Sequence, residues 1–204
     1  MEQRVLFCDR TPLFPGMPVL NEIRAPDRSA PRYCPERPLP AYRYVPGLHP
    51  HPVRDPQGHS YQAAPARNRH APWEVGAWRT LIDWLFGVDL FNAFYFWEAH
   101  ESWEGLWAAK PRDSAPARML QGLIQIAAAL LKIHLGSLAG AAALSREGLD
   151  KLAAVAATVP TMLGLQLPDT ITTFHHYFRP LKQRTLPPLD ASVPPLLLAG
   201  LSDA

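Results

Sequence analysis

Apolar residues recur at helical spacing from about residue 73 to residue 178, whereas the first third of the chain shows no such period. Spacings of three and four residues between apolar side chains predict amphipathic helices, and a proline or glycine ends most of these segments. The pattern predicts five helices, over residues 73–88, 89–109, 114–135, 138–159 and 169–178. Because their connections are short, neighbouring helices are expected to run antiparallel. The expected fold class is therefore all-α, a small antiparallel bundle of four to five helices.

Proline is concentrated ahead of this helical part, with fourteen of the 23 prolines in residues 1–72. Proline fixes φ and lacks an N–H donor, so this segment cannot form a continuous helix or a central strand. We interpret residues 1–72 as an irregular Pro/Arg-rich arm packed on the bundle, residues 73–180 as the helical domain and residues 181–204 as a loosely packed Pro-rich tail. Residues 41–61 are rich in aromatic, arginine and histidine side chains, and we expect them to lie ordered across the helices.

Charge is unevenly divided, although the whole chain has a formal net charge of only +2. Residues 1–72 hold ten arginines against six acidic residues, and the remainder holds ten basic against twelve acidic residues. The opposite sign of the two parts favours an arm that docks on the helical body. The small total charge gives no electrostatic reason to expect a nucleic-acid partner.

The N-terminus carries charge throughout and has no long apolar stretch, so no signal peptide is expected. The most apolar segment, 119–135, is interrupted by polar residues, which argues against a membrane span: Gln121, Gln125, Lys132 and His134. A cytoplasmic protein is expected, with Cys8 and Cys34 reduced, although two cysteines leave a disulfide open.

His100 and Glu104 lie one helical turn apart in the segment 89–109, and both fall within its aromatic stripe. Glu98 falls on the opposite side, where solvent is expected, and Glu101 falls at the edge. Moving a carboxylate out of water costs roughly several kcal/mol of folding free energy unless the group is paired, hydrogen-bonded or metal-bound. A polar partner is therefore expected to face the His100–Glu104 pair.

The segment 114–135 offers such a partner, because it is apolar on nearly every side and has one narrow polar stripe. A helix that is apolar all round is a central one, so its polar stripe is available to meet the aromatic helix. We predict a buried cluster between the two helices, made of His100, Glu104, Gln121, Gln125 and Arg118.

Three interpretations of this cluster are open. It could be a structural network that fixes the register of the two helices. It could bind a metal ion or a small ligand, since His at i and Glu at i+4 can share a cation. It could also perform acid–base catalysis, with Glu104 as the base beside His100. In the second and third cases four neighbouring residues would contact the ligand: Glu101, Arg118, Gln121 and Gln125.

The arm contains three histidines that could supply metal ligands: His49, His51 and His59. Alternating His and Pro is more typical of a rigid extended strap than of a metal site. If the strap crosses the bundle, Arg54, Asp55 or His59 could cover the cluster from outside. His134 lies on the apolar side of its segment and is expected to be a hydrogen-bonded core residue.

The stretch Leu90–Trp107 reads LFNAFYFWEAHESWEGLW, and a second block has Arg118 followed by LQGLIQIAAA over residues 120–129. Both blocks, in this order and at this spacing, resemble the two motifs of the DUF309 family of small all-helical proteins of unknown function. Phe94 stands where that family usually has glycine, and Ser137 replaces a common asparagine. The resemblance covers about residues 80–155 and implies an all-helical domain, but no substrate, reaction or cofactor.

Two hypotheses of different classes follow. The first is a binding or scaffolding protein in which the His100–Glu104 cluster is structural and the surface recognises a partner, including a second copy through the apolar tail, residues 193–201. The second is an enzyme that acts on a small molecule, with a divalent metal ion or by acid–base chemistry. A sealed cluster would favour the first, and a cluster that solvent reaches would favour the second.

Overall fold

The computed structural model describes residues 20–25, 31–61 and 72–200. A short 3₁₀ helix is followed by six α-helices: η1 (Val75–Thr80), α1 (Ile82–Asn92), α2 (Phe96–Ala108), α3 (Ala115–His134), α4 (Leu138–Ala156), α5 (Leu167–Tyr177) and α6 (Arg179–Lys182). Two short strands between α4 and α5, β1 (Thr161–Met162) and β2 (Leu165–Gln166), pair antiparallel. The all-α fold class is confirmed, with this small hairpin as an addition that the periodicity did not predict.

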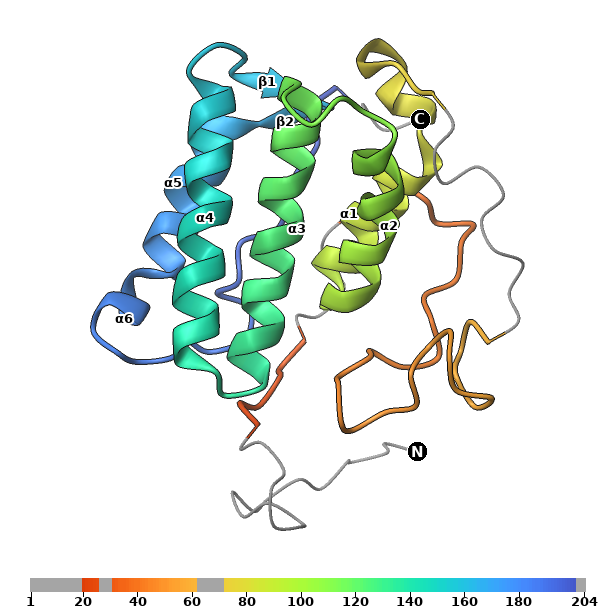
Figure 1. Cartoon of the computed structure of the whole chain (residues 1–204), viewed down its shortest axis with the longest axis vertical. Coiled ribbons are helices and arrows are strands. Elements are labelled where there is room, and N and C mark those ends of the chain that lie inside the picture. Colours follow the sequence, from red (N-terminus) through yellow and green to blue (C-terminus); the bar gives the residue numbers. More distant parts are fainter. Residues whose placement is uncertain (1–19, 26–30, 62–71, 201–204) are drawn as a thin grey trace.

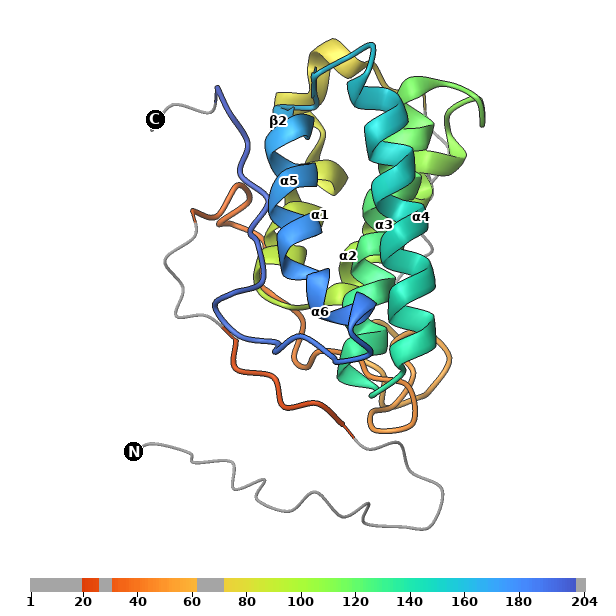
Figure 2. The ribbon, with the colours of Figure 1, turned by 90° about the vertical axis from the view of Figure 1, so that its left-hand side faces the viewer.

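The long helices α3 and α4 run antiparallel, and Figure 1 shows α3 between α4 and α2. Figure 2 shows that α5 and α1 form the other side of the bundle, where Phe91 of α1 meets Phe174 of α5 with ring centroids 6.0 Å apart. The largest fully buried side chains come from α1, α2, α3, α4 and α5 and include Trp84, Phe91, Trp103, Met119, Leu123, Ile126, Leu130, Leu152 and Phe174. One shared core therefore fixes the relative positions of these five helices.

The boundary between the first two helices differs from the prediction. Helix α1 continues past Val88 to Asn92, and the chain then turns at Phe94, whose φ of 65° lies in the left-handed region. This backbone conformation suits glycine and costs energy for a bulky residue. The Phe94 ring is nevertheless buried and stacks on Phe96 at 5.2 Å, so apolar packing offsets the strain and sets the angle between α1 and α2.

Ser114 and Ser137 stand at or just before the start of the third and fourth predicted helical segments, where a serine is predicted to cap the helix that follows. The two behave differently. Ser114 has an extended ψ of 148°, and its side chain accepts a hydrogen bond from the Ala117 N–H at 3.4 Å, as predicted. Ser137 has a ψ of 85° and makes no capping hydrogen bond, so the cap predicted for it is wrong. The backbone before α4 is not extended enough to aim the hydroxyl at the first turn of that helix.

The tail after α6 is packed on the bundle, contrary to the loose packing predicted for it. Val193, Leu196 and Leu198 are buried. The Asn92 side chain at the end of α1 accepts a hydrogen bond from the Leu196 N–H at 2.8 Å and donates one to the Leu196 carbonyl at 2.9 Å. Val193, Leu196 and Leu198 therefore pack on their own chain, whereas Leu197 is exposed, and the homodimer stays a prediction.

Residues 31–61 of the arm lie against the bundle beside α1 and α2, as the fold class predicted (Figure 1). The sequence also predicts a short strand at residues 4–7; that segment and Cys8 lie outside the described residues. Within the part of the chain that the structure describes, no helix is long and apolar enough to cross a membrane.

Candidate functional site

The predicted pair occupies one face of α2 and is joined there by Glu101. His100 Nε2 lies 3.1 Å from Glu104 Oε1, and His100 Nδ1 lies 3.7 Å from Glu101 Oε1. One ligand atom from each of the three side chains lies within 4.8 Å of the other two. We call these three residues the α2 cluster. A single helix forms it, because residues four apart stand one turn above each other and the next residue in sequence lies at the edge of the same face.

Solvent reaches the α2 cluster, although the sequence predicted it to be buried. The exposed fraction of the side chain is 25% for His100, 28% for Glu101 and 46% for Glu104. The buried positions of α2 instead form a neighbouring stripe, Phe96, Ala99, Trp103 and Leu106. The α2 cluster therefore stands beside the core rather than inside it.

The polar stripe of α3 does not join the α2 cluster. Gln125 Nε2 donates a hydrogen bond to Glu147 Oε2 of α4 at 2.8 Å. Close approach of α3 and α4 explains this orientation, because a Cβ added at Gly148 would lie 2.7 Å from the Gly122 carbonyl oxygen and 3.3 Å from the Gln125 Cβ. Gln121 and Arg118 likewise line a groove toward α4. Among the described residues, no hydrogen bond links this stripe to the α2 cluster.

Two other carboxylates are buried, and both bind the arm. Asp89 of α1 is fully buried and accepts three hydrogen bonds. Its Oδ2 accepts from Arg32 Nε at 2.9 Å and from the Cys34 N–H at 2.8 Å. Its Oδ1 accepts from the Tyr33 N–H at 2.7 Å. Asp89 thereby supplies the negative charge and the acceptors that hold residues 32–34 on the bundle.

Glu98 of α2 holds the next part of the arm. Its Oε1 accepts from the Tyr44 N–H at 2.8 Å and lies 3.2 Å from His59 Nε2, while Nδ1 of the same ring lies 2.8 Å from Ser60 Oγ. The Glu98 and His59 side chains are only 5% and 7% exposed. Burial raises the pKa of Glu98, against the opposing effects of the Tyr44 N–H and of His59.

Helical periodicity placed Glu98 in solvent, and this prediction is wrong because the arm covers that side of α2. The strap was expected to cover the His100–Glu104 pair, with His59 as one candidate. In the structure His59 contacts α2 at Glu98, two residues before His100 and on another side of the helix. A carboxylate within a predicted helix, and a histidine in a strap predicted to be ordered, were the only sequence features that pointed to this contact.

A second group of histidines lies where the arm meets the end of α3. His49 Nδ1 and His134 Nδ1 are both buried and have no hydrogen-bond partner among the described residues, so the hydrogen bond expected for His134 is not found at this atom. Burial lowers the pKa of both rings. The positive charges of His49 and Arg43 lower the pKa of His134 further, to about 4.

Folding stability should fall in mild acid because of His134. Folding lowers the pKa of His134, so as the pH falls the unfolded chain binds a proton at this ring before the folded chain does. The contribution of the neutral ring to the free energy of unfolding is therefore complete above about pH 6.5 and is lost as the pH falls toward 4. Allowing for partial solvent screening, we expect a loss of about 2 kcal/mol between pH 7 and pH 4.5. Urea unfolding of the wild type and of His134→Gln at each pH measures this loss. A pH dependence that is identical in the two proteins would exclude His134 as its source.

These features define the class of protein: a small helical bundle whose first two helices carry a solvent-accessible His/Glu cluster and two buried carboxylates that bind an N-terminal arm. Residues 84–144 match the model of the family described as "Domain of unknown function (DUF309)". This match confirms the resemblance seen in the sequence over residues 84–144. The matched segment contains the α2 cluster as well as Asp89 and Glu98, whereas the arm, α5 and the tail lie outside it. No curated protein matches the chain.

Proposed function

We propose that this protein binds a divalent metal ion through His100, Glu101 and Glu104 and presents the ion to a small molecule from solvent. The observation that carries this proposal is the grouping of an imidazole and two carboxylates with ligand atoms within 4.8 Å of one another. Ligand atoms about 2.1 Å from a zinc ion stand roughly 3–4 Å apart, so small side-chain rotations suffice to bring the three onto one ion.

The accessibility of the α2 cluster supports this proposal. A side-chain ion pair that solvent reaches contributes little to folding stability, whereas a metal ion that acts on a ligand needs coordination positions open to that ligand. The 46% exposed fraction of Glu104 leaves such positions to water or to a ligand. By the criterion derived from the sequence, an accessible cluster favours chemistry over a purely structural network.

The structural role first considered for His100 and Glu104 is filled elsewhere in the fold. Asp89 and Glu98 are the buried carboxylates of the domain, and each is hydrogen-bonded to the arm. A partly exposed His–Glu pair at i and i+4, such as His100–Glu104, contributes only about 0.3–0.5 kcal/mol to a helix. Stability therefore gives little reason for the α2 cluster, and a ligand-binding role accounts for it better.

The ligand types indicate the class of metal. One imidazole nitrogen with carboxylate oxygens suits Zn²⁺, Mn²⁺ or Co²⁺ better than the softer metals that thiolates select. Such an ion would act on a bound molecule as a Lewis acid or through a metal-bound water. Both roles of the ion agree with the second hypothesis from the sequence, an enzyme that acts on a small molecule with a divalent metal ion.

Replacing His100 with alanine should strongly weaken specific metal binding. We expect the wild type to bind one Zn²⁺ or Co²⁺ per chain in metal-free buffer at pH 7.5, and His100→Ala to bind at least about tenfold more weakly. Glu104→Gln should weaken binding as well, since the amide keeps the shape but loses the charge. Isothermal titration calorimetry measures the affinity, and the visible absorption of Co²⁺ reports the coordinating nitrogen and oxygen atoms.

The chain has eight histidines, so weak binding of zinc at other surface sites must be separated from this site. His176→Ala is the matched control, because His176 is exposed on α5 and belongs to no group of three possible ligands among the described residues. It should bind metal as the wild type does. Equal losses in His100→Ala and His176→Ala, or a wild type that binds no metal, would rule out the proposed site.

A further inference from the structure

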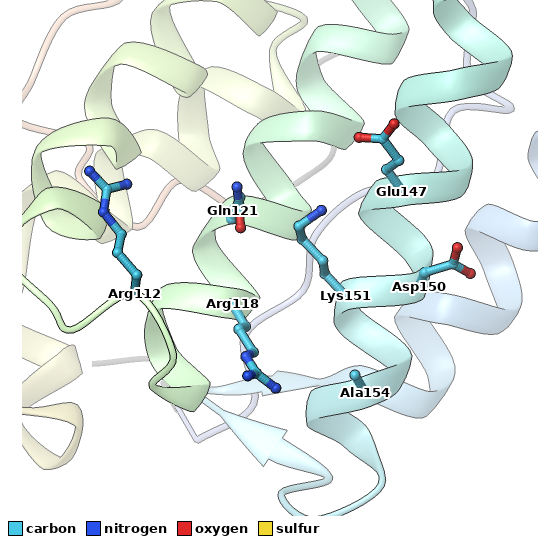
Figure 3. Close-up of a pocket in the computed structure, with 7 residues that line it drawn as sticks. All are labelled: Arg112, Arg118, Gln121, Glu147, Asp150, Lys151 and Ala154. Carbon is cyan, nitrogen blue, oxygen red and sulfur yellow. The ribbon is translucent and has the colours of Figure 1, made fainter.

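A groove on the other side of α3 carries positive charge that the proposed metal site does not use. It has a volume of about 370 Å³ and lies between the loop after α2, the first half of α3 and the middle of α4. Its lining residues are Arg112, Arg118, Gln121, Glu147, Asp150, Lys151 and Ala154 (Figure 3). We call it the α3–α4 groove. Its three cations come from three different segments, so only the tertiary structure brings them together.

Within the described segments, the three cations of the α3–α4 groove form no salt bridge, although two carboxylates, Glu147 and Asp150, also line it. In residues 20–25, 31–61 and 72–200, no salt bridge within 4.0 Å involves Arg112, Arg118 or Lys151; the bridges that occur join other pairs. Glu147 and Lys151 stand at i and i+4 on α4, a spacing at which the two ordinarily pair. Here Gln125 of α3 holds Glu147 instead. Figure 3 shows Lys151 directed toward Gln121 and the Asp150 carboxylate directed away from α3.

Other contacts restrain two sides of the groove. The Arg112 guanidinium lies 3.5 Å from the centre of the Trp107 ring, so stacking limits its motion. Gly122 and Gly148 hold α3 and α4 at close range beneath the groove. The half-buried Gln121 makes no side-chain hydrogen bond within the described part of the chain, which leaves its amide N–H groups available.

We propose that the α3–α4 groove binds a small molecule that carries more than one phosphate group. Arginine guanidinium and lysine ammonium groups are the side-chain groups that bind phosphate oxygens best. The groove holds two of the former and one of the latter. Figure 3 shows the three spread around the groove rather than converging on one point. This spacing suits a chain of phosphates better than a single phosphate ion. The inference does not depend on the metal site, because none of its residues belongs to the α2 cluster.

The proposal is tested with inorganic tripolyphosphate, pyrophosphate and monophosphate as separate probes in metal-free buffer of low ionic strength. We expect tripolyphosphate to bind with a dissociation constant below about 1 mM, more tightly than monophosphate. Arg118→Ala and Lys151→Ala should each weaken it at least about fivefold, and added salt should weaken it further. These side chains are exposed or half-buried, so the variants should fold, which circular dichroism verifies.

Arg146→Ala is the matched control, since Arg146 is exposed on α4 next to Glu147 but does not line the groove. It should bind tripolyphosphate within about twofold of the wild type. A loss in Arg146→Ala as large as that in Lys151→Ala would show diffuse attraction to the surface and overturn the proposal, as would a wild type that binds none of the three probes.

A second comparison separates the sources of the phosphate chain. Adenosine triphosphate that binds with the same affinity as tripolyphosphate would show that the groove recognises the phosphates alone, whereas tighter binding would add a nucleoside to the ligand; both outcomes support the proposed site. His100→Ala should bind tripolyphosphate as the wild type does. Failure of the metal site and failure of the groove are therefore distinguishable.

Discussion

Replacing Asp89 with alanine should destabilise the protein by about 3–5 kcal/mol and release the N-terminal arm. The carboxylate is fully buried and accepts from the Arg32 side chain and from the Tyr33 and Cys34 backbone N–H groups. Alanine leaves a half-buried guanidinium and two N–H groups without their acceptor, and unsatisfied buried groups cost more than their hydrogen bonds contribute. Urea unfolding measures the stability, and trypsin cleavage after Arg32 and Arg43 reports release of the arm.

Asp83→Ala is the matched control for this experiment, because it removes a carboxylate from the same helix that also pairs with the arm. The Asp83 side chain is 60% exposed and lies 3.3 Å from Arg37 Nη1. An exposed pair of this kind contributes less than about 1 kcal/mol. Asp89→Ala and Asp83→Ala with equal stabilities would mean that burial of the carboxylate does not hold the arm.

Release of the arm has a second readout in the Cys34 thiol. The side chain is 1% exposed, and burial raises its pKa to about 11, so it should react slowly with a thiol reagent in the wild type. In a Cys8→Ser background, Asp89→Ala should react faster in proportion to the fraction of chains with the arm released. Faster reaction without any loss of stability would show that the arm opens independently of the bundle.

Gly87→Ala should destabilise the bundle by about 3 kcal/mol, even though alanine favours the helical state by about 1 kcal/mol over glycine. A Cβ added at Gly87 of α1 would overlap Nε1 of Trp103 and lie 2.6 Å from its Cδ1. The Trp103 ring is fully buried against Trp84, so it has no free space into which to move. Thermal unfolding followed by near-ultraviolet circular dichroism records both the stability and the packing of the two indoles.

Gly76→Ala provides the comparison for Gly87→Ala. A Cβ at Gly76 meets no atom within 4 Å, and it lies in η1 just before the bundle. The free energy of unfolding of Gly76→Ala should stay within about 0.5 kcal/mol of that of the wild type. Wild-type stability in Gly87→Ala would mean that α1 and α2 are not packed as closely as the structure has them.

The helices and the α2 cluster could be predicted because they depend on local spacing. Apolar residues three and four positions apart mark a helical face, and His100 and Glu104 are adjacent on any helix that contains them. The break at Phe94 could not be located in this way. No proline marks it, and burial of the Phe94 ring, not its backbone preference, decides where α1 ends.

The direction in which each polar side chain points depended on neighbours distant in sequence. Arg32 and Asp89 are 57 residues apart, and Tyr44 and Glu98 are 54 apart. Helical periodicity assigned Glu98 to solvent because it carries no information about a segment that folds back over that side. The same limit applies to Gln125, whose partner became Glu147 of α4 once two glycines brought α3 and α4 together.

The sequence by itself determined the class of fold, the helical segments, the family motif and the one-turn spacing of His100 and Glu104, since each follows from residues within a few turns of one another. The tertiary structure decided which carboxylates are buried, that solvent reaches the α2 cluster, and that three cations line one groove. Burial and charge pairing are sums over all neighbours in space, and most of those neighbours lie far away along the chain.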